Sequence, residues 1–88
     1  MNYVAEVRAE VAEATGCSGM LLDLYTLLVF TKGKFTTLED VHDAWSVWKN
    51  AKMPDHRSLI PYDELTLEVQ ELDRDYANAI IKVAKEIK

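Results

Sequence analysis

Both histidines and both tryptophans of this chain lie between positions 42 and 56. Imidazole can accept, donate or transfer a proton near neutral pH, and an indole face can stack on a planar base or attract a cation. Residues 42–62 carry two acids and three bases, in a chain whose net charge is -5. An anionic ligand has few other favourable places on this chain. We therefore expect a ligand site in this window.

Helical spacing brings part of this window together. His42, Trp45 and Lys49 follow each other at steps of three and four, so they share one face of a helix. An indole beside cationic donors suits a purine that carries phosphates. The alternative is a core role, because Trp45 and Trp48 also continue the apolar line of Leu38 and Val41. Spacing alone leaves both alternatives open.

Motifs for other chemistry are missing from the sequence. Cys17 is alone, so we expect neither a disulfide framework nor a CxxC metal pair. There is no glycine-rich phosphate loop and no nucleophile elbow. We therefore expect no metal, no cofactor and no enzyme, the alternative being a hydrolase that uses His42 and His56 as acid and base. The net charge of -5 also opposes nucleic-acid binding, which uses many lysines and arginines.

The periodicity of apolar residues predicts an all-α fold. Eighty-eight residues suit one domain. We expect a compact four-helix domain with an extended, proline-containing loop at 55–62 before the last helix. The predicted helices cover 3–14, 19–32, 38 to about 50, and 66 or 67 to the end of the chain. The first two form an N-terminal pair over residues 1–35.

Three of these helices carry further expectations. The second is apolar on nearly every face, so it should be the most buried element. Thr36 with Glu39 forms a capping-box pattern for the third helix, and Thr37 with Asp40 is a weaker alternative. The last helix has an apolar stripe that faces the core or a second copy of the chain. This stripe consists of Val69, Leu72, Tyr76, Ile80, Val83 and Ile87.

The sequence gives no sign of a membrane or secretion segment. Its densest apolar run, Met20–Phe30, contains Asp23 and is shorter than the roughly 20 residues that a membrane span needs. The N-terminal residues show neither a basic leader nor a signal-peptide pattern. We expect a cytoplasmic protein that binds no membrane.

Three motifs in order give the chain a resemblance to a known family. They are Val41-His42-Asp43-Ala44-Trp45, then His56-Arg57-Ser58-Leu59-Ile60-Pro61-Tyr62-Asp63-Glu64-Leu65, then Glu71-Leu72-Asp73-Arg74. This order resembles the ryanodine receptor repeat (RyR) domain, in a unit that would span residues 36–88. Arg57 replaces the family's usual proline, Ile60 its valine and Leu72 its tyrosine. The stretch between Trp45 and His56 is also shorter than in family members.

The resemblance implies binding of an adenine nucleotide without catalysis. Single short copies resemble small proteins of actinobacteriophages. The implied function is that of a viral sponge, which sequesters an immune signal such as a cyclic ADP-ribose isomer made by a TIR-domain defence enzyme. It would act in the host cytoplasm.

Roles for individual residues follow from the same resemblance. Trp45 or Tyr62 would stack on adenine, and His42 would hydrogen-bond the ribose or order the loop. The expected pyrophosphate ligands are Lys49, His56 and Arg57. The alternative function is a small helical protein–protein interaction module, acting on a host or self partner, with a homodimer through the last helix.

Overall fold

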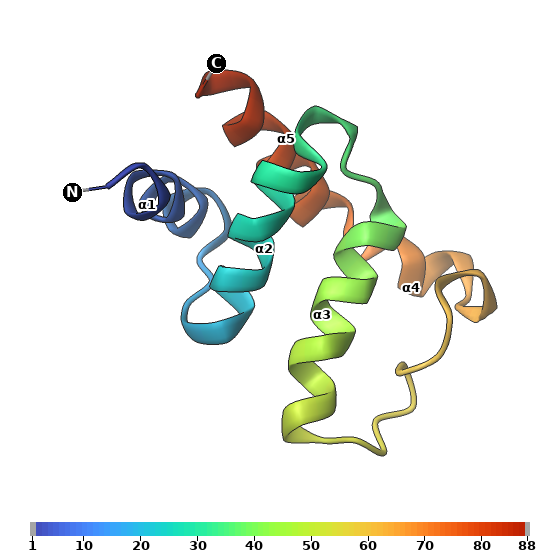
Figure 1. The fold of residues 1–88 in the computed structure, drawn as a ribbon. Coiled ribbons are helices and arrows are strands. Elements are labelled where there is room, and N and C mark those ends of the chain that lie inside the picture. The colour runs from blue at the N-terminus through green and yellow to red at the C-terminus, as the bar shows by residue number, and fades with distance from the viewer. Residues whose placement is uncertain (1, 88) are drawn as a thin grey trace.

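The computed structural model describes residues 2–87, and all regular structure in that range is helical (Figure 1). The helices are α1 (Tyr3–Thr15), α2 (Gly19–Thr31), α3 (Leu38–Lys52), α4 (Leu67–Glu71) and α5 (Arg74–Glu86), with 3-10 turns η1 (Gly33–Phe35) and η2 (Tyr62–Glu64). The prediction of an all-α fold is confirmed. The radius of gyration, 12.8 Å, is close to the roughly 12 Å typical of a globular chain of this length.

The core lies where α2 meets α1, α3 and α5. Its buried apolar side chains are Val7, Val11, Leu22, Tyr25, Val29, Val41, Ala77, Ile80, Val83 and Ala84. Figure 1 shows α3 beside α2, with the chain after α3 returning along it toward α4. The space between α2, α3 and the start of α5 is therefore bounded on one side by a loop.

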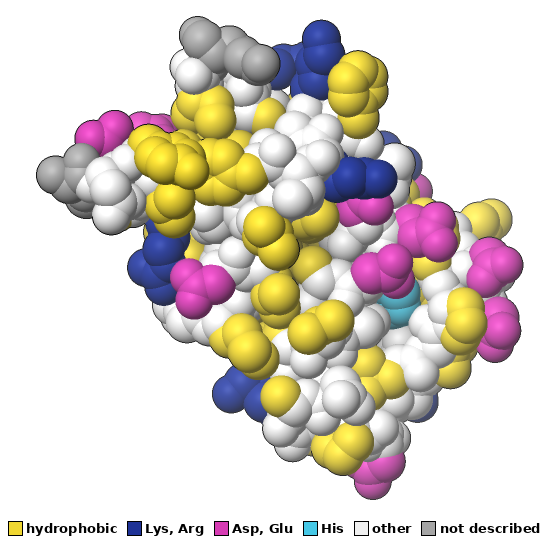
Figure 2. Space-filling model, in the orientation of Figure 1, with side chains coloured by type: hydrophobic (Ala, Val, Ile, Leu, Met, Phe, Trp, Pro, Cys, Tyr) yellow, Lys and Arg dark blue, Asp and Glu magenta, His cyan; other side chains and the backbone are white. Residues whose placement is uncertain are grey.

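The second helix is only partly buried, contrary to our expectation. Leu22, Tyr25 and Val29 face the core, whereas Leu27 is 54% exposed and Phe30 is also exposed. Phe30 packs edge-on against Tyr3 of α1, with ring centroids 5.5 Å apart. In Figure 2, hydrophobic side chains gather over α1 and α2 and continue toward α3. Neighbouring helices cover one side of α2 and leave the opposite apolar side open.

The third helix begins with the capping box that we considered the weaker of two. The Thr37 hydroxyl accepts a hydrogen bond from the Asp40 N–H, and the Asp40 carboxylate accepts one from the Thr37 N–H. Thr36 is instead buried, and its hydroxyl donates to the Gly33 carbonyl at 2.7 Å. The preferred Thr36–Glu39 box was wrong, because the Thr36 side chain is already used to close the preceding turn.

The predicted fourth helix is divided at Leu72 and Asp73. Asp73 has φ -90° and ψ -4° and precedes α5 as its N-terminal cap residue. In the predicted stripe, Ile80 and Val83 are buried in the chain's own core, but Leu72 is 69% exposed. The break changes the direction of the stripe between α4 and α5. Ile80 and Val83 therefore serve intrachain packing, whereas Leu72, Tyr76 and Ile87 of the same stripe stay exposed. A homodimer through the last helix stays a prediction.

Side chains from the helices hold the loop between α3 and α4. His42, 3% exposed, donates from Nε2 to the Ile60 carbonyl at 2.8 Å. The Gln70 amide donates to the carbonyls of Tyr62 and Leu65 at 3.0 and 3.2 Å. These contacts place the loop against α3 and α4.

Within the described residues, none of the helices is by itself long and apolar enough to cross a membrane. Only α1 and α2 taken together reach that length and composition, and they are bent by 110° relative to each other.

Candidate functional site

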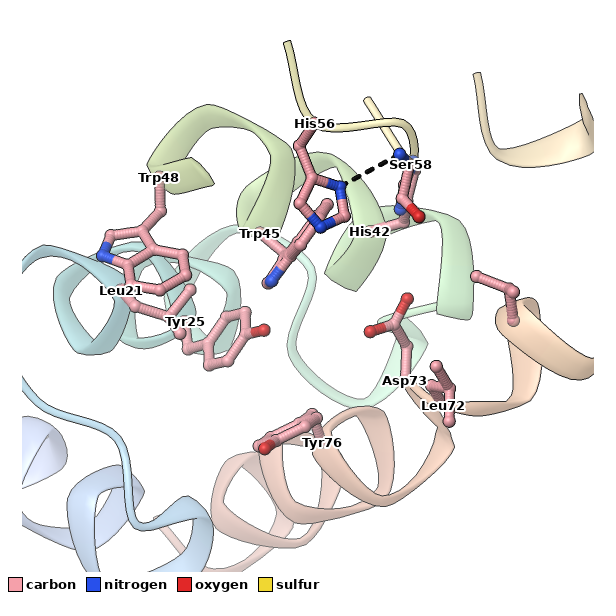
Figure 3. Close-up of a pocket in the computed structure, with 11 residues that line it drawn as sticks. Leu21, Tyr25, His42, Trp45, Trp48, His56, Ser58, Leu72, Asp73 and Tyr76 are labelled. Carbon is pink, nitrogen blue, oxygen red and sulfur yellow. Dashed lines mark hydrogen bonds between the residues drawn. The ribbon is translucent and has the colours of Figure 1, made fainter. Parts of the chain in front are cut away.

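A cavity of about 460 Å³ lies between α2, α3, the loop and the start of α5. Pockets for small molecules usually measure roughly 300–1,000 Å³. The residues that line it are Leu21, Tyr25, His42, Trp45, Trp48, His56, Ser58, Val69, Leu72, Asp73 and Tyr76. Figure 3 shows the Tyr25 hydroxyl, the Trp45 indole nitrogen and the Asp73 carboxylate directed into the hollow. The cavity thus combines apolar walls with a few convergent polar groups.

Aromatic rings form most of its walls. Trp45 is stacked with His42 at a centroid distance of 5.9 Å and meets His56 edge-on at 5.3 Å. Tyr25 and Tyr76 face the same hollow from α2 and α5, 5.7 Å apart. Rings held from different elements form surfaces on which a planar group can stack.

Local hydrogen bonds determine what each neutral histidine offers the cavity. His42 donates from Nε2 to the loop, so its Nδ1 is an acceptor in the neutral ring. At His56 the order is reversed, since Nδ1 accepts from the Ser58 N–H at 3.0 Å and Nε2 then carries the proton. The two rings therefore supply one acceptor and one donor.

Asp73 is the acidic group of the cavity. Burial raises the pKa of its carboxyl above the ordinary range, and the nearby His42 partly opposes this. The hydroxyl of Tyr25 has a raised pKa as well, first because of burial and second because of the negative charge of Asp73. Tyr25 therefore remains a neutral phenol next to a carboxylate.

The cations lie outside the lining of the cavity. Among residues 2–87, neither a lysine nor an arginine contributes to the cavity wall. The ammonium groups of Lys49 and Lys52 lie 5.5 and 5.4 Å from the ring centre of Trp48, which itself lines the cavity. No group of three His, Cys, Asp or Glu side chains within this range could hold a metal ion. The interior accordingly favours hydrogen-bond donors, and the lysines over Trp48 favour anions.

The structure brings together three of the six predicted ligand residues. His42, Trp45 and His56 line the cavity, and Lys49 lies outside the wall, over the ring of Trp48. Tyr62 packs on His42, 6.2 Å between ring centroids, but is not part of the wall. Arg57 is exposed and also outside the wall. The cavity therefore excludes Arg57 and Tyr62 and includes residues of α2 and α5 instead.

Sequence reasoning missed the residues that enter the cavity from α2 and α5. Tyr25 stood in an apolar helix and Tyr76 in an apolar stripe, so both were assigned to packing. Asp73 was named only within the motif Glu71-Leu72-Asp73-Arg74, and no role was predicted for it. One available signal was an aspartate inside an otherwise helical pattern, because aspartate favours caps and turns. A break at Asp73 would have directed attention to this end of α5.

The fold and the cavity define a small all-α domain with an aromatic-walled, acid-containing pocket. The chain belongs to the family DUF7701, a domain of unknown function, whose family model matches residues 2–85. No curated protein and no solved structure matches the chain.

The family match corrects the resemblance to ryanodine receptor repeats. No RyR family model matches, and the DUF7701 match runs through α1 and α2 as well as the proposed repeat unit. Local structure accounts for much of the shared pattern. Val41 is fully buried, His42 anchors the loop, and Arg74 forms a bidentate pair with Glu71. Because these requirements are structural, they can produce a similar order of residues without the same family.

Proposed function

We propose that this domain binds a small ligand with a planar nitrogen heterocycle, the base of a nucleotide, without chemically converting it. The observation that carries the proposal is the cavity itself. Trp45 and Tyr76 provide stacking surfaces, and polar atoms of Asp73 and the histidines provide hydrogen-bond partners inside it. A pocket with apolar walls and a few convergent polar groups is typical of small-molecule sites.

The two lysines over Trp48 offer a place for the phosphates. Lys49 and Lys52 lie over the Trp48 ring, at the last turn of α3. A base inside the cavity would leave its sugar and phosphate directed outward, where ammonium groups can form charge-assisted hydrogen bonds. Lys52 thereby joins Lys49 as a phosphate contact, whereas Arg57 is left in solvent.

Backbone hydrogen bonds hold each histidine of the cavity in place. One nitrogen of each ring is engaged in a hydrogen bond with the backbone, His42 with Ile60 and His56 with Ser58. Both rings therefore have an evident positioning role. The role of a viral sponge for a cyclic ADP-ribose isomer rested on the corrected resemblance. We therefore propose nucleotide binding alone.

Isothermal titration with AMP, GMP, CMP and UMP tests this proposal. We expect saturable binding of at least one of them, and Trp45→Ala should weaken it by about 5- to 100-fold, the range for loss of stacking on one base. Phe35→Ala removes an aromatic ring that does not line the cavity, so it should bind like the parent protein. Absence of heat with all four nucleotides, in protein that circular dichroism shows to be folded, would rule the proposal out.

A second candidate function is self-association through the open side of α2. This side exposes Met20, Leu27 and Phe30, and Phe30 extends it to Tyr3. A helix that is apolar on nearly all faces is usually buried on all of them, and a contiguous apolar patch marks a contact surface. The occupant that we propose is a second copy of this chain, since a small domain gains core by pairing.

A further inference from the structure

Asp73 occupies a helix cap position without capping the helix. An aspartate at the start of a helix usually accepts a hydrogen bond from a backbone N–H two or three residues later. The Asp73 side chain makes no such bond to α5, and its backbone is already helical. Figure 3 shows its carboxylate directed into the cavity instead. Among the hydrogen bonds and ion pairs within residues 2–87, none involves this carboxylate.

The surroundings of Asp73 leave a need for donors. The carboxylate is partly buried, which raises its pKa, and His42 opposes this only in part. Neither lysine nor arginine stands in the described wall to neutralise it. A half-buried carboxylate with two unpaired oxygens is stabilised by a ligand that presents N–H groups to both. The Tyr25 and Tyr76 rings flank the approach to it.

We infer that the base bound in this cavity is guanine, read by Asp73 through two adjacent N–H donors. This inference rests on the proposed nucleotide binding and names the base. Guanine presents N1–H and the exocyclic N2–H side by side, which matches the two oxygens of one carboxylate. Adenine presents a ring-nitrogen lone pair beside its N6–H, so one carboxylate oxygen would face a second acceptor. Hypoxanthine retains N1–H but lacks the second donor.

A guanidinium group offers the same pair of donors, as in free arginine. The aromatic walls would also attract such a cation. The two lysines over Trp48 favour the nucleotide, because a phosphate brings more negative charge to them than the α-carboxylate of free arginine, which is accompanied by an α-ammonium group. Arginine is accordingly the competing ligand to test.

Isothermal titration of the full chain with GMP, IMP, AMP and arginine tests the inference. GMP should bind about 10- to 100-fold more tightly than IMP, which is the contribution of one hydrogen bond to a charged group. AMP and arginine should bind more weakly than GMP. In Asp73→Asn the preference for GMP over IMP should disappear, because the amide offers one acceptor and one donor in place of two acceptors.

Asp75→Asn is the matched control. Asp75 is an exposed acid in the first turn of the same helix and does not line the cavity, so its loss should leave the preference for GMP unchanged. If AMP binds as well as GMP and Asp73→Asn changes neither, the guanine inference is overturned while nucleotide binding stands. Binding of arginine without GMP, or of none of the four ligands, overturns the guanine inference. Nucleotide binding is overturned with it only if CMP and UMP also give no heat.

Discussion

The ionised form of Asp73 destabilises the folded protein. Burial raises its pKa, so the folded protein holds this proton more tightly than the unfolded chain does. Stability must then fall as pH rises from the ordinary carboxyl pKa of about 4 through the raised value, and the full cost applies above it. A carboxylate that stabilised the fold would have a lowered pKa, and stability would then rise with pH over this range. The behaviour of Asp73 suits an acid kept for a ligand.

Asp73→Asn should therefore stabilise the free protein at neutral pH. The gain should disappear below about pH 4, where the parent carboxyl is protonated in both the folded and unfolded states. Thermal melts of the parent and the variant across this pH range measure the effect. Asp75→Asn should show no comparable gain, because it removes an exposed acid from a helix N-terminus. Equal melting behaviour of Asp73→Asn and Asp75→Asn at every pH would refute this account of Asp73.

His42 shows how far one residue could be interpreted from sequence. Its place on a helical face beside Trp45 was predictable from spacing, and the ring does line the cavity. Its bond to the Ile60 carbonyl, 18 positions away, was one of two open alternatives. Spacing defines neighbours on one helix, but it does not say which loop carbonyl returns to that helix. Asp73 and Tyr25 were missed for the same reason.

At the scale of elements, local sequence signals predicted the helix bounds well. They did not decide between two cap patterns that overlap. The predicted bounds of the first three helices, 3–14, 19–32 and 38 to about 50, lie within two residues of those of α1, α2 and α3. The capping box was misassigned because Thr36 and Thr37 both fit the pattern. Thr36 is buried and its hydroxyl is bonded to the Gly33 carbonyl, which closes the preceding turn and leaves Thr37 to cap the helix. The capping-box pattern contains no information about this competing bond.

The capping box gives a direct test at this scale. Thr37→Ala should lower the free energy of unfolding by about 1 kcal/mol, because it leaves the Asp40 N–H without its side-chain acceptor. Urea denaturation monitored by circular dichroism measures the change. Glu39→Ala is the control, since Glu39 belongs to the rejected box and should cost less. A larger loss for Glu39→Ala than for Thr37→Ala would contradict the observed cap.

The break between α4 and α5 links an element to the site. A continuous last helix would have extended the apolar stripe through Leu72 and Tyr76. The break leaves Leu72 mostly exposed and places Asp73 at the cavity. Periodicity predicted the existence of the helix but could not reveal the break, because Leu72 and Tyr76 continue the pattern on both sides of it.

On the scale of the whole molecule, the apolar content of α2 exceeds what this fold buries. We expected every face of this helix to be covered, yet Leu27 and Phe30 are exposed. The apolar composition of α2 does not show which of its faces is covered within the chain and which would be covered by a second chain. The arrangement of α1, α3 and α5 leaves this side open (Figure 1).

Sedimentation velocity tests the proposed self-association. The parent protein should form a dimer that dissociates on dilution, and Leu27→Glu should sediment as a monomer with unchanged helical content. Leu67→Glu introduces the same charge at an exposed leucine on α4, away from α2, and should still form the dimer. A parent protein that remains monomeric at every concentration would exclude the second candidate function.

The central claim is that the cavity beside Trp45 receives the base of a nucleotide. The indole N–H of Trp45 points into that cavity, and the chain has two tryptophans, so a ¹H–¹⁵N spectrum should contain two indole signals. Trp45→Phe identifies which of them belongs to Trp45. On titration with GMP the account predicts a saturable shift of the Trp45 indole signal. If that signal stays in place with GMP, AMP, CMP and UMP alike, the claim is contradicted.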